Sequence, residues 1–198
     1  MESSTFKTDC SSYIAKVSNS FSEEIYYAIE SLALTLREVW SKGNKVFICG
    51  NGGSAANAIH IANDFIYGTG ACGQGDKIPG IKVEALSSNS GVLTCIANDT
   101  GYENIYSYQL DVNANPNDLL IALSGSGNSP NIVNALIKAK EKKLKSFAIL
   151  GFDGGKCLKE ADMAIHFKVH DMQVSEDLQL IAAHICMQWL SKNKVTNY

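Results

Sequence analysis

Two short segments rich in glycine and serine hold the groups best suited to bind an anion. One is GNGGS at residues 50–54, and the other is SGSGNSPN at residues 124–131. The second segment offers hydroxyl groups from Ser124, Ser126 and Ser129, and its glycines allow a ligand to approach the backbone closely. Clustered hydroxyl and backbone N–H donors suit a phosphate group. We therefore predict a phosphate-binding site at these segments.

The pattern of glycines argues against the common nucleotide-binding loops. A Walker A loop needs a lysine directly after its glycines, and the dinucleotide-binding loop has the spacing GxGxxG. Neither pattern occurs at residues 50–54 or 124–131. One such segment alone could be only a tight connection between a strand and a helix. Two of them favour a small phosphorylated ligand without a nucleotide cofactor.

Each segment lies between a predicted strand and a predicted helix. The apolar run KVFIC at 45–49 precedes the first, and apolar residues at helical spacing follow at 55–67. The run DLLIALS at 118–124 precedes the second, and a helical pattern follows at 131–143. A helix N-terminus carries unpaired N–H groups and the positive end of the helix dipole. Parallel sheets bind their ligands at the carboxyl ends of the strands, which is where both segments would lie.

Strands and helices alternate along the rest of this region. We expect further strands at 81–86, 146–152 and 163–169, a short apolar segment at 91–97, helices at 105–110 and 175–190, and a glycine-rich loop at 68–80. Asn98 and Asp99 are expected in a polar turn. This alternation predicts an α/β fold with a central parallel sheet covered by helices on both faces.

The N-terminal part of the chain has a different pattern. Apolar residues recur at helical spacing from Ser12 to Trp40, and Gly43 gives a stop signal. This spacing predicts one or two amphipathic helices, so we expect a helical segment at 1–43 and an α/β domain at 44–198. The apolar stripe of the helical segment favours packing against sister subunits.

Composition limits both the partners of the chain and the way it could hold an anion. The 198 residues carry a net charge of −3, and Arg37 is the only arginine among 17 basic residues. A nucleic-acid partner would normally require a basic face, so none is expected. Because an arginine clamp is nearly absent, backbone amides and hydroxyls must supply most of the contacts to a phosphate.

Cysteines and the N-terminus bear on the compartment. The six cysteines have no metal-ligand spacing, and several lie in apolar runs such as VFIC, which is typical of buried thiols in a reducing compartment. The first residues are polar and acidic, unlike a signal peptide, and no apolar run has the length of a membrane span. We therefore expect a cytoplasmic protein without a membrane partner.

Four ordered motifs resemble those of the phosphoheptose isomerases within the sugar isomerase (SIS) domain family. They are GNGGSAANAIH at 50–60, LTCIANDTGY at 93–102, LSGSGNSPN at 123–131 and LGFDGGK at 150–156. The resemblance implies a flavodoxin-like α/β/α sandwich that assembles as a homotetramer. It also implies interconversion of sedoheptulose 7-phosphate and D-glycero-D-manno-heptose 7-phosphate, commonly with zinc.

The resemblance also assigns roles to individual residues. The family's contacts to the sugar phosphate correspond to Asn51, Gly52, Gly53, Asp64, Asn98, Asp99, Ser124, Gly125, Ser126, Ser129 and Glu176. Its metal and acid/base positions correspond to His60, Asp64, Glu176 and His184, with catalysis expected of Asp64 and His184. His60 and Asp64 are spaced i, i+4, while Glu176 and His184 are eight apart, so each pair shares a helix face. Two histidines and two carboxylates suit zinc or a similar ion.

Three positions depart from the family pattern. Asp64 replaces the usual glutamate, which shortens the proposed base by one methylene. Glu176 replaces the usual glutamine, and its charge should attract a divalent cation but repel a sugar phosphate. Gly68 replaces an arginine, which removes one expected ligand contact.

Two functions remain open at this point. The first is an aldose–ketose isomerase of a seven-carbon sugar phosphate that serves heptose and surface-polysaccharide biosynthesis. The second is a non-catalytic SIS-domain protein that binds a sugar phosphate as a regulatory signal or associates with a replication initiator. His60, His184 and a carboxylate at position 64 favour the enzyme. Either histidine taken alone would more often be a packed or surface side chain.

Overall fold

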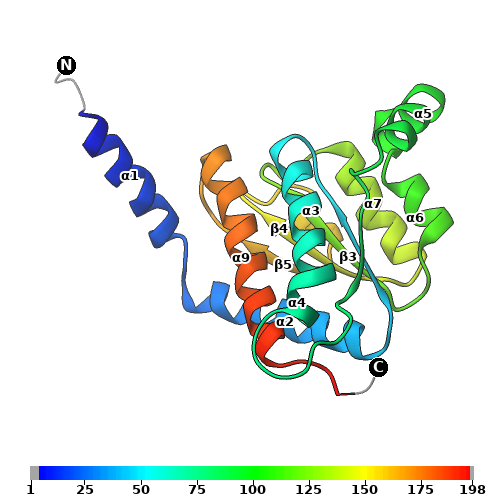
Figure 1. Ribbon diagram of the computed structural model, residues 1–198. Coiled ribbons are helices and arrows are strands. Elements are labelled where there is room, and N and C mark those ends of the chain that lie inside the picture. Colours follow the sequence, from blue (N-terminus) through cyan, green and yellow to red (C-terminus); the bar gives the residue numbers. More distant parts are fainter. Residues whose placement is uncertain (1–4, 197–198) are drawn as a thin grey trace.

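A parallel sheet forms the centre of the computed structural model, which describes residues 5–196 (Figure 1). Its strands are β1 Lys45–Cys49, β2 Lys82–Ala85, β3 Leu119–Ser124, β4 Lys145–Leu150 and β5 Met163–His166. They lie in the order β2-β1-β3-β4-β5, and all neighbouring pairs are parallel. This is the flavodoxin-like order, so the predicted fold class is confirmed.

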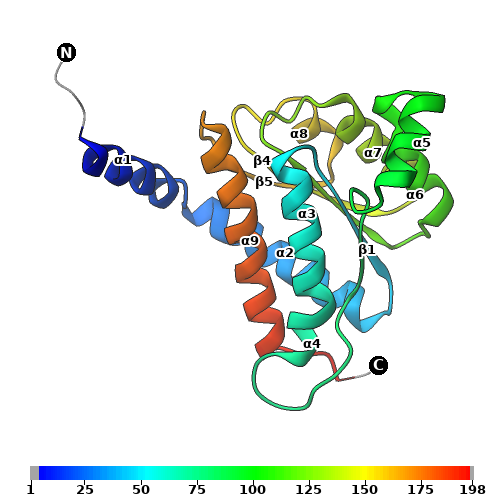
Figure 2. The ribbon, with the colours of Figure 1, turned by 45° about the horizontal axis from the view of Figure 1, so that its top comes forward.

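Helices connect the strands and cover both faces of the sheet (Figures 1 and 2). They are α1 Phe6–Asn19, α2 Glu23–Ser41, α3 Gly53–Asn63, α4 Thr69–Ala71, α5 Ser90–Thr100, α6 Ser107–Asn113, α7 Pro130–Glu141, α8 Cys157–Glu160 and α9 Met172–Lys192. A π-helical turn spans Asp64–Gly68, and a 3-10 turn spans Tyr102–Asn104.

Alternating side chains of the strands divide the core into two layers. Val46 and Ile48 of β1 face a layer formed by α2, α3 and α9. Phe47 and Cys49 face the opposite layer, formed mainly by α6, α7 and α8. Successive residues of a strand point to opposite faces, so continuously apolar strands are expected when helices cover both sides.

The helix after β1 is longer than the sequence predicts. It begins at Gly53 rather than at residue 55, and helical structure continues through the π turn and α4 to Ala71. The expected loop at 68–80 therefore begins only after Ala71. Gly68 and Gly70 are buried, and a Cβ on Gly70 would collide with the backbone of Ile78. Gly70 thus permits close packing against the returning chain, whereas Gly68 packs against the side chain of Met187 in α9.

The apolar segment and the polar turn predicted at 91–99 together form one helix. The side chain of Asn89 caps α5 by accepting a hydrogen bond from the N–H of Val92 at 3.1 Å. The helix ends at Gly101, whose φ of 97° suits glycine. The polar turn expected at Asn98 and Asp99 is therefore wrong, because both residues lie in the last turn of this helix.

The two N-terminal helices have different environments. Helix α2 shares the core of the sheet domain through side chains such as Leu32 and Leu36, whereas no residue of α1 is buried. Figures 1 and 2 show α1 extending from the body of the molecule. Tyr13 ties α1 to α9 by donating a 2.6 Å hydrogen bond to Asp177, which raises the pKa of Tyr13 to about 12. The division at residue 43 stays a prediction.

Half of the cysteines have the burial expected from the sequence. Cys49, Cys157 and Cys186 are buried, and burial raises the pKa of the Cys157 and Cys186 thiols to about 12. Cys10, Cys72 and Cys95 are exposed, so the expectation of burial does not extend to them. Among the described residues, no helix has the length and apolar character needed to cross a membrane.

Candidate active site

A cavity of about 300 Å³ opens where the chain leaves the carboxyl ends of β1 and β3. Its lining includes eight of the predicted ligand-binding residues: Asn51, Gly52, Gly53, Ser124, Gly125, Ser126, Ser129 and Glu176. Because β1 and β3 are adjacent, the two glycine- and serine-rich segments form neighbouring walls of one site. The strand order also changes direction at β1 and β3, which is where open parallel sheets bind ligands.

Hydrogen bonds within the second segment hold its backbone in a tight turn. The N–H of Gly127 donates to Ser124 Oγ at 3.1 Å, and the N–H of Asn128 donates to Ser126 Oγ at 3.3 Å. Gly127 has a φ of 67°, and a Cβ there would collide with the carbonyl group of Gly154. Both features require glycine at position 127.

The motif LGFDGGK supports this turn from behind. The N–H of Cys157 donates to the carbonyl oxygen of Gly127 at 2.9 Å, and the N–H of Lys156 donates to Asn128 Oδ1 at 3.1 Å. These bonds join the turns after β3 and β4. The motif at 150–156 therefore contributes to the site by fixing the turn at 124–131 rather than by lining the cavity.

Two helix N-termini lie at the cavity wall. Helix α3 begins at Gly53, and α7 begins at Pro130 directly after Ser129. The first N–H groups of α3 have no partners within the helix, whereas the first residue of α7 is a proline without an N–H, so α3 offers more free donors. The positive ends of both helix dipoles favour an anion. Together with the serine hydroxyls, they give the cavity the donors that a phosphate requires without an arginine.

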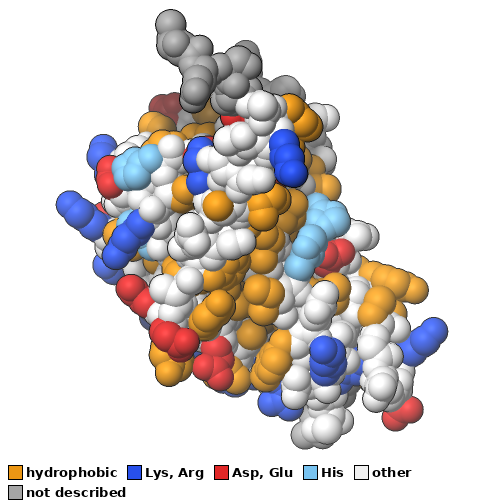
Figure 3. Space-filling model, turned by 90° about the vertical axis from the view of Figure 1, so that its left-hand side faces the viewer, with side chains coloured by type: hydrophobic (Ala, Val, Ile, Leu, Met, Phe, Trp, Pro, Cys, Tyr) orange, Lys and Arg blue, Asp and Glu red, His pale blue; other side chains and the backbone are white. Residues whose placement is uncertain are grey.

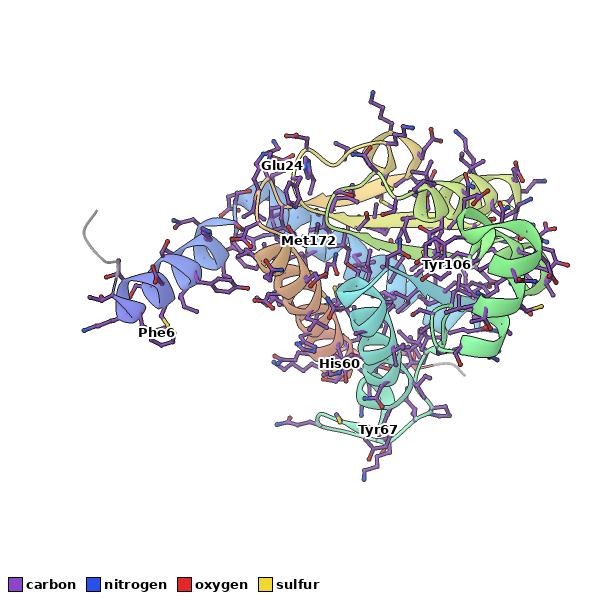
Figure 4. The ribbon with its side chains drawn as sticks, turned by 90° about the horizontal axis from the view of Figure 1, so that it is seen from above. Phe6, Glu24, His60, Tyr67, Tyr106 and Met172 are labelled. Atoms are coloured by element: carbon purple, nitrogen blue, oxygen red, sulfur yellow. The ribbon has the colours of Figure 1, made fainter. Side chains whose placement is uncertain are left out.

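A second group of side chains lies farther along α3 and α9. His60 Nε2 lies 2.9 Å from His184 Nε2, and the Asp64 carboxylate lies 3.5 Å from His60 Nε2 and 3.2 Å from His184 Nε2. One ligand atom from each of the three residues falls within 4.8 Å of the others. Figure 4 shows His60 between α3 and α9, on the side of the helical layer away from the sheet.

The donor set of this group fits a divalent transition metal. Two imidazole nitrogens and one carboxylate oxygen form the kind of three-ligand set that catalytic zinc sites use, with one position left for a ligand. Asp64 also begins the π-helical turn. Such turns occur frequently at functional sites. The three residues could hold the metal that the sequence predicts.

Glu176 does not lie with the other predicted metal ligands. Its carboxylate lies at the first residue of α3, where a Cβ on Gly53 would collide with it. Glu176 and His184 share a face of α9, but eight residues span about 12 Å along a helix. The structure therefore brings together three of the four predicted ligands and places Glu176 in the wall of the cavity beside β1 and β3 instead.

Asn98 and Asp99 are also separated from the cavity. Both are exposed on α5, where Asn98 Nδ2 donates to Asp99 Oδ1 at 2.8 Å. Neither is among the residues that line the cavity. The structure does not bring these two predicted contacts to the site because helix α5 continues through them.

Met172 is a cavity residue that the sequence reasoning missed. It is the first residue of α9, and a Cβ on Gly125 would meet its sulfur. Asp171 is the sequence signal for the start of this helix. Its side chain caps α9 by accepting a hydrogen bond from the N–H of Val174 at 3.3 Å. Recognition of this cap would have started the helix before residue 175 and placed its first turn at the cavity.

Glu176→Gln is expected to tighten the binding of inorganic phosphate by about tenfold, because it removes a like charge from the cavity wall. Bound metal is expected to stay unchanged, since the carboxylate lies about two helical turns from His184. Calorimetry and elemental analysis would measure the two effects. The control is Asp177→Asn, which removes a neighbouring exposed carboxylate that accepts a hydrogen bond from Tyr13. A loss of metal in Glu176→Gln alone would return Glu176 to the ligand set.

Comparison with known proteins agrees with this geometry. The family model of the SIS domain matches residues 11–151. The phosphoheptose isomerase of Aneurinibacillus thermoaerophilus is 37% identical over 163 residues, which cover 82% of this chain and 80% of that protein. The phosphoheptose isomerase of Aliarcobacter butzleri is 36% identical over 177 residues, with 88% of each chain covered.

Solved structures show the same fold. A phosphoheptose isomerase from Francisella tularensis superposes with a TM-score of 0.85 and 22% identity, covering 96% of this chain and 100% of that chain. The phosphoheptose isomerase GmhA from Neisseria gonorrhoeae gives a TM-score of 0.82 at 24% identity, covering 94% and 98%. From its motifs, its fold and these relatives, the chain belongs to the phosphoheptose isomerase family of SIS-domain proteins.

Proposed function

We propose that this protein is an aldose–ketose isomerase that interconverts sedoheptulose 7-phosphate and D-glycero-D-manno-heptose 7-phosphate in heptose and surface-polysaccharide biosynthesis. One observation carries the proposal: the phosphate cavity and the group His60, Asp64 and His184 lie on the same two helices. From Gly53 to His60 the separation along α3 is about 10 Å. An extended sugar phosphate anchored at the cavity could reach the group with its far end.

The metal in this proposal is zinc, held by His60, Asp64 and His184. When bound, the ion supplies a Lewis acid that polarises the carbonyl oxygen of the sugar. Glu176 was expected as a fourth ligand, but its place at Gly53 favours a role at the phosphate end. The convergence of two imidazoles and a carboxylate supports this assignment.

Proton transfer is assigned to Asp64 and His184. The reaction removes the proton from C1 of the ketose, passes through an enediol and returns a proton to C2, so it needs a base and an acid on one side of the sugar. The Asp64 carboxylate and His184 Nε2 lie 3.2 Å apart, so both can reach adjacent carbons of one ligand. An imidazole nitrogen bound to a metal has no free lone pair, so His184 Nε2 transfers a proton only while it is not a metal ligand. Either residue could serve as the base, with the other as the acid.

Residues at the phosphate end act by binding and orientation. The hydroxyls of Ser126 and Ser129 and the N-termini of α3 and α7 hold the phosphate at one end of the sugar. Binding at a distance from the reacting carbons fixes C1 and C2 near Asp64 and His184, which lowers the entropic cost of reaching the transition state.

A homotetramer is the proposed assembly, on the basis of the family resemblance. The side chains of His60 and His184 are 48% and 41% exposed, which is high for a reaction that benefits from the exclusion of water. An apolar groove lined by Tyr26, Tyr27, Ile185 and Trp189 lies between α2 and α9. Figure 3 shows apolar side chains gathered in a band beside a pair of histidines. A sister subunit packed on this face would cover both features.

Light scattering at micromolar concentration is expected to give a mass about four times that of the 21.4 kDa chain. The apolar groove and the exposed α1 supply surface for this assembly. A monomeric mass would contradict the proposed tetramer. It would also require the His60 and His184 group to function while exposed to solvent.

Ser126→Ala is expected to weaken sugar-phosphate binding by about tenfold or more, because it removes a hydrogen bond to a charged group. The hydroxyl also accepts from the N–H of Asn128, so the backbone of the turn should loosen as well. Calorimetry with sedoheptulose 7-phosphate would measure the change. Ser11→Ala, on the exposed surface of α1, is the control. Unchanged affinity would remove this hydroxyl from the site.

A panel of five-, six- and seven-carbon sugar phosphates tests the proposed function. Zinc-loaded protein is expected to isomerise the seven-carbon pair fastest and to lose activity with a chelator. Binding of a sugar phosphate without turnover would favour the regulatory alternative.

The cytoplasm is the proposed compartment of the protein. The free cysteines support it, because disulfides are rare in the reducing cytoplasm.

A further inference from the structure

Asn51 in the first phosphate-binding segment forms a reciprocal amide pair with Asn131. Asn51 Nδ2 donates to Asn131 Oδ1 at 2.8 Å, and Asn131 Nδ2 donates to Asn51 Oδ1 at 2.8 Å. Asn51 follows β1, whereas Asn131 is the second residue of α7. The pair therefore joins the two segments that form the walls of the phosphate cavity.

Two tyrosines from the connection after α5 complete this arrangement. Tyr102 Oη donates to Asn51 Oδ1 at 3.0 Å. The buried hydroxyl of Tyr106 donates to the carbonyl oxygen of Gly50, the residue before Asn51. Figure 4 shows Tyr106 inside the helical layer beside the sheet. Both the backbone and the side chain of the turn after β1 are thus held by residues outside the cavity.

These bonds determine which atoms of Asn51 remain for a ligand. A side-chain amide has two N–H donors and an oxygen with two lone pairs. Asn131 and Tyr102 both donate to Oδ1, and Asn131 accepts one N–H. Among the hydrogen bonds of the described residues, the second N–H of Asn51 is left over. Asn51 lines the cavity, so this N–H is suited to an oxygen of the ligand.

Asn131 cannot be a ligand contact in the same way. The residue is only 1% exposed, and it is not among those that line the cavity. Burial of an amide is favourable when its polar atoms have partners, and the pair gives the nitrogen and the oxygen of Asn131 one partner each. The burial of Asn131 gives the pair a fixed position at the start of α7.

We propose that Asn131 and Tyr102 are positioning residues that hold Asn51 as a hydrogen-bond donor to an oxygen of the sugar phosphate. The inference rests on the proposed function for its ligand. It adds two residues that act on substrate binding only through their contacts with Asn51. Without them, the Asn51 side chain could rotate and present its oxygen, which would repel an anionic ligand.

Crystal structures of Asn131→Ala and of a matched control test the positioning directly. Asn134 lies about one turn farther along α7, and its Nδ2 donates to the carbonyl oxygen of Glu103 at 3.0 Å. Asn134→Ala therefore removes an amide from the same helix without touching Asn51. The Asn51 side chain is expected to change rotamer or lose order in Asn131→Ala and to stay unchanged in Asn134→Ala. An unchanged Asn51 in both variants would overturn the proposal.

A double-mutant cycle tests whether the effect on the substrate passes through Asn51. Asn131→Ala is expected to lower kcat/KM about tenfold, mainly through KM, because the donor acts in ground-state binding. The same change in an Asn51→Ala background is expected to cost less than about threefold, because Asn51 is already absent. A structural role of Asn131 that does not involve Asn51 would give the same loss in both backgrounds. That outcome would overturn the proposal.

Tyr102→Phe provides a second variant if Asn131→Ala does not fold. Tyr102 is 58% exposed, so removal of its hydroxyl should not affect folding. The expected result is a rise in KM of about threefold, which disappears in the Asn51→Ala background. A KM equal to that of the parent would count against the proposal. If the parent protein turns over no heptose phosphate, the proposed function fails, and the position of Asn51 in the crystal structures still decides the inference.

Discussion

His184→Gln is expected to abolish most isomerase activity, by about 100-fold or more, while the protein remains folded. Glutamine is close to histidine in size and forms hydrogen bonds, but it does not titrate near neutral pH and removes the imidazole ligand. His184 Nε2 lies 3.2 Å from the Asp64 carboxylate and 2.9 Å from His60 Nε2, so its loss affects both proton transfer and metal binding. The rate of heptose phosphate isomerisation measures the loss of activity, and the Tm in chelator shows whether the variant remains folded.

The matched control for this change is His170→Gln. His170 is exposed near Asp153 and belongs to neither group of site residues. It is expected to keep the activity and Tm of the parent. Full activity in a folded His184→Gln protein would contradict the proposed mechanism. Gross unfolding in chelator would instead indicate that His184 serves mainly to pack α9.

Asp64→Asn is expected to lower activity by about 100-fold or more, because the amide can neither take up a proton nor provide an anionic ligand. The side chain keeps its size, and its position at the start of the π turn should be retained. Elemental analysis separates the two roles. Loss of activity with normal metal content would assign Asp64 to proton transfer, whereas loss of both would assign it to metal binding.

Asp111→Asn is the control for this variant. Asp111 is an exposed carboxylate of α6 near Lys138, away from the histidines. Its replacement is expected to leave activity and metal content unchanged. Parent-level activity together with parent-level metal in Asp64→Asn would remove Asp64 from both roles.

Local sequence signals were sufficient for the strands of the sheet and for the two segments that line the cavity. Runs such as KVFIC are short, apolar and followed by glycine, so β1 and the turn after it could be placed within a few residues. The same reasoning located β3 and the start of α7. Because the carboxyl ends of parallel strands lie at one edge of the sheet, these placements predicted both segments at that edge, and the adjacency of β1 and β3 brings them to one cavity.

Features that depend on contacts between helices could not be predicted in this way. The spacing of apolar residues does not indicate the π turn at Asp64–Gly68, so the sequence predicts that the helix after β1 ends at Tyr67. The sequence predicts that Glu176 and His184 share a face of α9. It does not predict which residues of α3 lie opposite each of them. Gly53 lies opposite Glu176, whereas His60 lies opposite His184.

Polar residues were the other source of error. Asn98 and Asp99 are typical of turns, but the cap at Asn89 and the stop at Gly101 place both residues inside α5. Asn131 lies in a segment that the sequence did single out, yet its pairing with Asn51 depends on the adjacency of β1 and β3. Only the fold supplies that information.

Incubation of zinc-loaded protein with sedoheptulose 7-phosphate in D₂O, followed by NMR, tests the central claim most directly. The expected product is D-glycero-D-manno-heptose 7-phosphate that carries deuterium at C2, because the proton that the base removes from C1 exchanges with D₂O before it is returned to C2. The His184→Gln protein should form almost none. A folded, metal-loaded parent protein that binds the ketose phosphate but forms no aldose phosphate would contradict the account.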